Sequence, residues 1–152
     1  MRIVADSSVA LKWWLDDEEF VEEAKLLLKK AIAGDIEIVV PELWYCEIVN
    51  GITVAVKRNR ISEKQGLKFI EELSAIPAKQ YQITSHMNKI FKRAVKYKST
   101  SYDMTYLIIA ELEDILFITG DKKLFDAVKH DRPFVKYVSD VKKIISAGDK
   151  NA

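Results

Sequence analysis

Four acidic residues of this 152-residue sequence are candidates for chemistry, because each lies next to or within an apolar segment. Asp6 and Asp121 each follow a short apolar run, Glu47 lies within an apolar helical pattern, and Asp103 stands near the start of another. If folding gathers these carboxylates, they cannot all remain ionised without a cation, because repulsion raises their pKa values. Hard oxygen ligands select Mg²⁺ or Mn²⁺. Such a cation activates water and stabilises the oxygens of a phosphoryl displacement.

Each of these acids also has a purely structural explanation, which the residues alone leave open. Asp6 and Asp121 suit helix N-caps, where Asp stabilises by about 1 kcal/mol relative to Ala. Asp103 falls in a first helical turn, where the helix dipole contributes about 0.3–1 kcal/mol. Glu47 is harder to explain, because burying a charge costs several kcal/mol unless it is paired, protonated or bound to a cation. It would otherwise reach solvent at the helix edge or meet one Lys or Arg.

Short apolar runs alternate with amphipathic segments along the whole chain. The predicted strands are residues 3–5, 36–40, a weaker 81–83, 115–119 and 134–137. The predicted helices are residues 8–14, 17–33, 42–58, 62–75, 85–97, 102–113, 122–129 and 139–147. This alternation predicts an α/β domain with a parallel sheet covered on both faces. Ligands of such sheets bind outside the carboxyl ends of the strands, which is where two of the acids stand.

Composition restricts the class of protein but does not name a ligand. The length and 49% apolar content fit one compact domain, and the net charge of +1 indicates no polyanionic partner by itself. Cys46 is the only cysteine, and His86 and His130 are the only histidines, so a disulfide framework and a zinc cluster are excluded. The sequence has no signal peptide or membrane-spanning run, so we expect a cytoplasmic protein without membrane attachment.

The four acids and their surroundings resemble the motifs of the PIN-domain family, specifically the VapC-type ribonuclease toxins of VapBC toxin–antitoxin modules. The resemblance covers nearly the whole chain in order. The matching stretches are "DSS" from Asp6, "PELWYCEIVN" around Glu47, "SYDMTYLIIA" around Asp103, and "TGDKKL" around Asp121. The chain departs from the pattern at Met104, where many relatives have a small residue, and at Lys122 and Lys123, where some carry a fifth acid. A second metal would therefore be weakly held or bound only with substrate.

This resemblance implies a fold, an activity and partners. The implied fold is a three-layer α/β/α domain with a central, mainly parallel sheet, spanning residues 1–147 and followed by a flexible tail at 148–152. The implied activity is Mg²⁺- or Mn²⁺-dependent cleavage of RNA by metal-activated water, in a homodimer silenced by a VapB-like antitoxin. Asp6 and Asp103 would bind the first metal, Asp121 the second or both, and Glu47 a metal directly or through water. The hydroxyls of Ser8 and Thr119 would orient these carboxylates or a phosphate.

The local charge suggests where RNA would bind. No acidic residue occurs between positions 73 and 102, and this stretch supplies the candidate RNA-binding residues Lys89, Lys92, Arg93 and Lys96. The same residues also form the solvated face of an amphipathic helix, so that alternative stays open. Phe91 and Tyr97 are candidates for stacking on bases, although core packing is the first expectation for Phe91.

Adjacent tryptophans, Trp13 and Trp14, follow the first motif. Packing under a neighbouring helix is the first expectation for both, but two neighbouring positions of a helix cannot share one face, which would leave at least one of them partly exposed. An exposed ring here would offer a surface for an antitoxin or a second protomer.

Other functions stay open at this level. A PIN-domain nuclease acting in RNA processing or on DNA would have the same acids. A carboxylate-centred phosphohydrolase would use Asp6 as a nucleophile, but it usually needs a second Asp where Ser8 stands. A non-catalytic interaction module would keep the acids only as helix caps.

Overall fold

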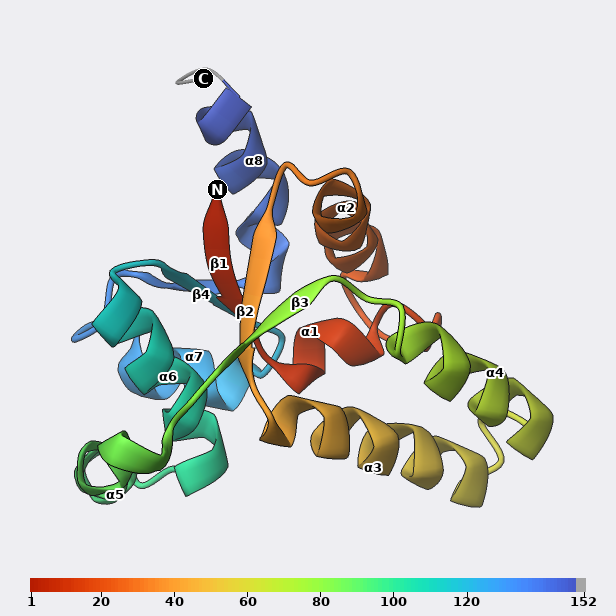
Figure 1. Cartoon of the computed structure of the whole chain (residues 1–152), viewed down its shortest axis with the longest axis horizontal. Coiled ribbons are helices and arrows are strands. Elements are labelled where there is room, and N and C mark those ends of the chain that lie inside the picture. Colours follow the sequence, from red (N-terminus) through yellow and green to blue (C-terminus); the bar gives the residue numbers. More distant parts are fainter. Residues whose placement is uncertain (150–152) are drawn as a thin grey trace.

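The structure, a computed structural model, describes residues 1–149 of the chain; the last three residues of the predicted tail lie outside the described part. A five-stranded sheet in the order β3-β2-β1-β4-β5 forms the centre of the molecule (Figure 1). All four neighbouring strand pairs are parallel. The strands are β1 (Arg2–Ala5), β2 (Glu37–Pro41), β3 (Ala78–Tyr81), β4 (Leu116–Thr119) and β5 (Val135–Tyr137).

Helices cover both faces of this sheet, which confirms the predicted three-layer α/β/α arrangement. Figure 1 shows α5 and α6 on one side of the sheet and α1, α2 and α4 on the other. The helices are α1 (Ser7–Leu11), α2 (Val21–Ile32), α3 (Leu43–Lys57), α4 (Glu63–Leu73), α5 (Met87–Tyr97), α6 (Ser101–Glu113), α7 (Lys122–Val128) and α8 (Val141–Asp149). Two short 3₁₀ turns, η1 (Thr84–His86) and η2 (Val138–Asp140), precede α5 and α8.

The central strands are buried on both faces, which is why their sequences are apolar without alternation. Ile3, Val4 and Ala5 of β1 are fully buried, as is Phe117 of β4. Helix α6 packs on β1, β2 and β4, and its Tyr106 ring stacks on Phe117 with the ring centroids 6.0 Å apart. This packing places the start of α6 against the carboxyl ends of the central strands.

The predicted strands correspond to observed ones, and the boundaries differ most at one edge strand and at the last helix. The weak run at 81–83 forms a strand three residues earlier, β3, beside β2. Helix α8 continues to Asp149, beyond the boundary predicted at 147. Within residues 1–149, no helix is both long and apolar enough to cross a membrane.

The expectation that Trp13 or Trp14 is partly exposed is wrong, whereas their packing against neighbouring helices is confirmed. The two side chains are only 5% and 8% exposed. Helix α1 ends at Leu11, so the tryptophans lie in the turns that follow and are not held on opposite helix faces. The indole N–H of Trp13 donates to the carbonyl of Ala24 at 2.9 Å, and that of Trp14 to the Glu72 carboxylate at 2.8 Å.

Candidate active site

Asp6 lies at the junction of β1 and α1, at the carboxyl edge of the sheet. It is the N-cap of α1, and its Oδ1 accepts the Val9 backbone N–H at 3.2 Å. The structural explanation offered by the sequence is therefore confirmed, but it accounts for only one of the contacts. The Ser8 hydroxyl donates to Oδ1 and the Thr119 hydroxyl donates to Oδ2. Both predicted orienting hydroxyls thus contact this carboxylate.

The Asp6 carboxyl is buried, and burial dominates its ionisation. The side chain is 5% exposed. Desolvation and the negative charge of Asp103 raise its pKa, the hydrogen bonds from Ser8, Thr119 and Val9 lower it, and the net pKa is about 6. A carboxylate held ionised here at neutral pH costs free energy, which a bound cation would offset.

Thr119 and Ser8 connect the ends of two strands that are more than a hundred residues apart in sequence. Ala5 of β1 pairs with Ile118 of β4, so Asp6 and Thr119 become neighbours. The Thr119 hydroxyl, which donates to Asp6, also accepts the backbone N–H of Asp121 at 3.0 Å. The Ser8 hydroxyl accepts the backbone N–H of Gly120 at 2.7 Å. These bonds fix the turn that leads into α7.

Asp121 caps α7 at the end of this turn. Its Oδ1 accepts the Leu124 backbone N–H at 3.0 Å, and the residue is exposed to solvent. The predicted cap is confirmed here too. An N-cap carboxylate keeps further lone pairs, so it can bind a cation from its exposed side.

Glu47 projects from the middle of α3 and is half-buried. Its Oε2 accepts the hydroxyl of Tyr106, a residue of α6 that is 1% exposed. Desolvation and the negative charges of Asp6 and Asp103 raise the pKa of Glu47, the hydrogen bond from Tyr106 lowers it, and the net pKa is about 7. Within residues 1–149, no Lys or Arg pairs with Glu47, so the alternative of a simple ion pair is wrong.

Tyr106 is a site residue that the sequence did not single out. Burial and the neighbouring Glu47 raise the pKa of this phenol well above its usual value, so the hydroxyl is a permanent donor. The sequence contained one indication of this role. Tyr106 lies on the core-facing stripe of its helix, and a buried Tyr hydroxyl normally has a hydrogen-bond partner. Which partner it has depends on the packing of α6 against α3.

Asp103 stands in the first turn of α6. Its backbone N–H donates to the Thr100 hydroxyl at 3.0 Å, and its Oδ2 accepts the Ser99 hydroxyl at 2.9 Å. It faces Asp121 across a pocket of about 420 Å³. The pocket is lined by Tyr97, Lys98, Ser99, Thr100, Asp103, Asp121, Lys123, Leu124 and Ala127.

The four predicted acids therefore meet at one edge of the sheet, but they do not form a finished metal cage. The negative charge of Asp103 raises the pKa values of both Asp6 and Glu47, and Asp103 shares a pocket with Asp121. The donor set suits a divalent cation, because it is anionic, all-oxygen and partly desolvated. No group of three or more His, Cys, Asp and Glu side chains within residues 1–149 has the arrangement of a metal site. Binding an ion there requires the carboxylates to draw together.

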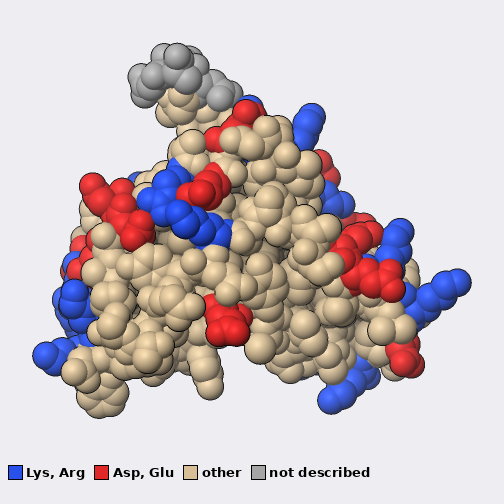
Figure 2. Space-filling model, in the orientation of Figure 1, with Lys and Arg blue, Asp and Glu red and all other residues tan. Residues whose placement is uncertain are grey.

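The predicted RNA-binding residues lie beside a different hollow. Arg93 pairs with Glu111 at 2.7 Å and Lys96 with Asp131 at 3.1 Å. Lys89, Lys92 and Arg93 border a pocket of about 270 Å³ between α5 and α6. Figure 2 shows basic and acidic side chains interspersed on the face it presents, without a continuous basic track. RNA binding by these residues remains a prediction.

The packing expected of Phe91 is wrong. Its side chain is 66% exposed, because the preceding residue, Ile90, takes the core-facing position of α5 and is only 3% exposed. Tyr97 is partly buried and lies beside Asp103 in the pocket of the carboxylates.

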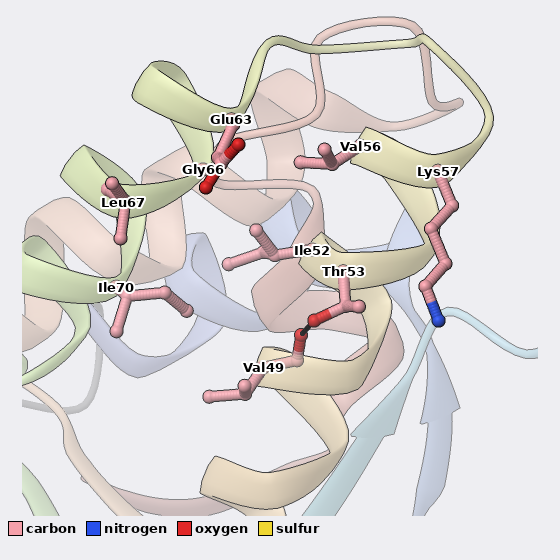
Figure 3. A pocket seen from close by; sticks show the side chains of 9 residues that line it. All are labelled: Val49, Ile52, Thr53, Val56, Lys57, Glu63, Gly66, Leu67 and Ile70. Atoms are coloured by element: carbon pink, nitrogen blue, oxygen red, sulfur yellow. Dashed lines mark hydrogen bonds between the residues drawn. The ribbon is translucent and has the colours of Figure 1, made fainter.

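A third hollow, between α3 and α4, lacks the features of a catalytic site. It has a volume of about 300 Å³ and is mostly apolar, lined by side chains such as Ile52, Val56 and Ile70 (Figure 3). The Thr53 hydroxyl in its wall donates to the carbonyl of Val49 at 2.8 Å. Glu63 is the only acidic residue in the lining, so the groove has no converging carboxylates.

Comparisons with known proteins agree with this geometry. Residues 3–131 match the PIN domain family. The chain is similar to a VapC ribonuclease of Mycobacterium bovis and to ribonuclease VapC9 of Mycobacterium tuberculosis, each 24% identical over 124 residues, with 82% of this chain and 89% of the relative covered. Its fold is similar to the crystal structure of PAE2754 from Pyrobaculum aerophilum, with a TM-score of 0.62, 19% identity, and 97% and 99% of the two chains covered.

Proposed function

This chain belongs to the PIN-domain family, and on that premise we propose that it is an endoribonuclease that depends on Mg²⁺ or Mn²⁺ and serves as the toxin of a toxin–antitoxin pair. The observation that carries the proposal is the joint burial of Asp6 and Glu47 beside Asp103, with the pKa values of Asp6 and Glu47 raised to about 6 and about 7. Without a bound cation, burying these carboxylates contributes no stability to the fold.

In the proposed mechanism, Asp6 and Asp103 hold the first cation, Asp121 contributes from the exposed side of the pocket, and Glu47 contributes directly or through water. A bound divalent cation lowers the pKa of water and stabilises the oxygens of the phosphodiester that is cleaved. Ser8 and Thr119 hold the Asp6 carboxylate in one orientation through their hydroxyls. Tyr106 does the same for Glu47.

The two competing interpretations of the acids are less well supported. A phosphohydrolase would need Asp6 as an accessible nucleophile, whereas this side chain is 5% exposed and both of its oxygens accept hydrogen bonds. A non-catalytic module that keeps the acids as caps accounts for Asp6 and Asp121. It does not account for Glu47, which lies in mid-helix with a tyrosine as its partner.

The relatives support the biological part of the proposal. Because they are VapC ribonucleases, we propose a VapB-like antitoxin as the partner of this chain, an RNA as its substrate and a homodimer as its working form. We also propose that residues 1–147 act as one nuclease domain. A PIN-domain nuclease that acts in RNA processing is the second candidate, since it would use the same edge of the sheet.

Cleavage assays test the catalytic part. The full chain is incubated with single-stranded and structured RNAs in Mg²⁺, Mn²⁺ or chelator, beside Asp6→Asn and Asp103→Asn. We expect cleavage only with the metals and a loss of at least about 100-fold in each variant. Asp114→Asn is the matched control, because Asp114 is exposed at the far end of α6. Metal-independent cleavage, or equal cleavage by the site variants, would contradict the proposal.

Calorimetry tests the role of Glu47 separately. Titration of Mn²⁺ into Glu47→Gln should give weaker binding than titration into the unmodified chain, because one anionic oxygen ligand is lost. Unchanged affinity would remove Glu47 from the metal site and leave the other three carboxylates in the proposal.

A further inference from the structure

The pocket beside the carboxylates has two walls of similar composition. The end of α5 and the segment that joins it to α6 supply Lys98, and the first turn of α6 supplies Asp103. The opposite wall, formed by α7 and its cap, supplies Asp121 and Lys123. Each wall thus combines one carboxylate with one lysine, so a cation-binding and an anion-binding group lie side by side on both.

Neither lysine has an ionic partner in the described part of the chain. No acidic side chain within residues 1–149 forms a salt bridge with Lys98 or Lys123. Their close neighbours differ, since Lys96 pairs with Asp131 at 3.1 Å and Lys122 pairs with Asp126. The charges of Lys96 and Lys122 are neutralised within the fold, whereas the charges of Lys98 and Lys123 are not neutralised by an acidic side chain within residues 1–149.

The backbone conformation at position 98 disfavours a lysine. Lys98 is the C-cap of α5 in the left-handed region, with φ 51° and ψ 40°. Gly or Asn is the usual residue at such a position, because the Cβ of most other residues strains the backbone there. The charge of Lys98 is favourable beside the C-terminal end of the helix dipole by about 0.3–1 kcal/mol, but it has no ion-pair partner within residues 1–149.

Lys123 is also placed against local preference. It lies in the first turn of α7, where a cation is unfavourable because it opposes the helix dipole. Lys122 in the same turn is compensated by Asp126 one turn further on, but Lys123 has no such compensation within residues 1–149. The helix dipole therefore disfavours Lys123, and the left-handed backbone disfavours the side chain of Lys98.

We propose that Lys98 and Lys123 bind successive phosphates of a single RNA strand that crosses the pocket between Asp103 and Asp121. This inference rests on the proposed nuclease function and specifies how that site holds its substrate. A volume of about 420 Å³ is in the range of about 300–1,000 Å³ typical of small-ligand pockets, so it admits one nucleotide of a strand rather than a duplex. In this proposal the two ammonium groups neutralise phosphates of the strand, in the same pocket as the two carboxylates.

This assignment differs from the one that the sequence suggested. Among the residues predicted to bind RNA, Arg93 and Lys96 already pair with acids. Lys89 and Lys92 are exposed and unpaired within residues 1–149, but they border the hollow between α5 and α6 and not the carboxylate pocket. Lys29 of α2 and Lys64 of α4 are exposed, have no salt bridge within residues 1–149 and line neither of these two hollows, so they provide a control that carries the same charge at another place.

The test measures binding separately from cleavage. Fluorescence anisotropy follows a labelled 12-nucleotide single-stranded RNA binding to the full chain carrying Asp6→Asn, in Mg²⁺ and over a series of KCl concentrations. The test variant adds Lys98→Asn and Lys123→Gln, because Asn tolerates the left-handed backbone. The control variant adds Lys29→Gln and Lys64→Gln instead. Thermal unfolding verifies that all three proteins are folded, and DNA of the same sequence shows whether the contacts depend on the ribose.

We expect the test variant to bind RNA about 10-fold more weakly, with a slope of log K against log[KCl] that is smaller in magnitude by about 1.4, or about 0.7 for each phosphate that a lysine no longer neutralises. The control should stay within about twofold of its parent. Unchanged affinity and slope in the test variant, or an equal loss of affinity in the control, would overturn the inference. If the unmodified chain fails to cleave RNA but the lysine effect appears, the proposed catalysis fails while the binding assignment stands.

Discussion

Replacing Asp6 by Asn should stabilise the metal-free protein at alkaline pH while abolishing cleavage. The carboxyl is buried, and its pKa is raised from 3.8 to about 6. The folded state therefore holds a proton that the unfolded state releases between about pH 4 and pH 6, so stability of the metal-free chain falls as pH rises through this window. Asn removes this penalty and is as good an N-cap as Asp.

The size of the effect follows from the shift. A change of about two pKa units corresponds to about 3 kcal/mol above pH 7. The Asn amide no longer accepts both hydroxyls, so one of the bonds from Ser8 and Thr119 must reverse or break, at a cost of about 1 kcal/mol. We expect a net gain of about 2 kcal/mol at pH 8. Each kcal/mol raises Tm by about 2–4 °C in a domain of this size.

Thermal and urea unfolding in EDTA between pH 4 and pH 8 measure this effect. The difference in Tm between Asp6→Asn and the unmodified chain should grow with pH and level off above about pH 7. Added Mg²⁺ or Mn²⁺ should stabilise the unmodified chain more than the variant at pH 8, because the cation binds the ionised site. Asp121→Asn is the matched control, since Asp121 is also an N-cap at this edge of the sheet but is exposed to solvent.

A lower Tm for Asp6→Asn at pH 8, by the same amount as at pH 5, would refute the reasoning. It would mean that the buried carboxylate stabilises the fold without a cation, as a purely structural cap does. An equal pH-dependent gain in Asp121→Asn would assign the effect to overall charge and not to burial.

Three further substitutions test the groups that support the carboxylates. Thr119→Val removes the hydroxyl that bridges two aspartates, so the free energy of unfolding by urea should fall by about 1–3 kcal/mol and the cleavage rate at least about 10-fold. Tyr106→Phe removes the donor to Glu47, and calorimetry should show Mn²⁺ affinity reduced about 10- to 100-fold with little change in Tm. In Gly120→Ala the new Cβ would lie 2.8 Å from Cε of Lys12 and 3.1 Å from the Ser8 hydroxyl, so both side chains must shift and cleavage should fall while circular dichroism stays the same. Full activity in any one of the three would mean that the altered group does not support the site.

The layers of the fold were predictable because the information is local. Apolar runs without alternation mark strands that are buried on both faces, and the amphipathic segments between them mark the helices that cover a parallel sheet. The same logic placed Asp6 and Asp121 at one edge, since each directly follows such a run. Only the edge strand β3 was misplaced by three residues, where a short and half-exposed sequence gives a weak pattern.

Several features of the site could not be predicted. The bond between Glu47 and Tyr106 joins residues 59 positions apart, and no periodicity encodes it. The burial of both Trp13 and Trp14 depended on where a short helix ends, which is the least reliable part of any sequence pattern. The lysines that line the pocket of Asp103 and Asp121 were not among the residues predicted to bind RNA, because α5 turns its most basic stretch toward another hollow.

The sequence by itself determined that this protein has a parallel α/β sheet with acidic residues after its strands, because strand and helix periodicity and residue type act over a few neighbouring positions. The tertiary structure decided which of those acids are desolvated, which hydroxyls hold them and which lysines share their pocket. Those outcomes come from the packing of α3, α6 and α7 around the ends of β1 and β4. Contacts between segments so far apart in the chain exist only once the whole core has formed.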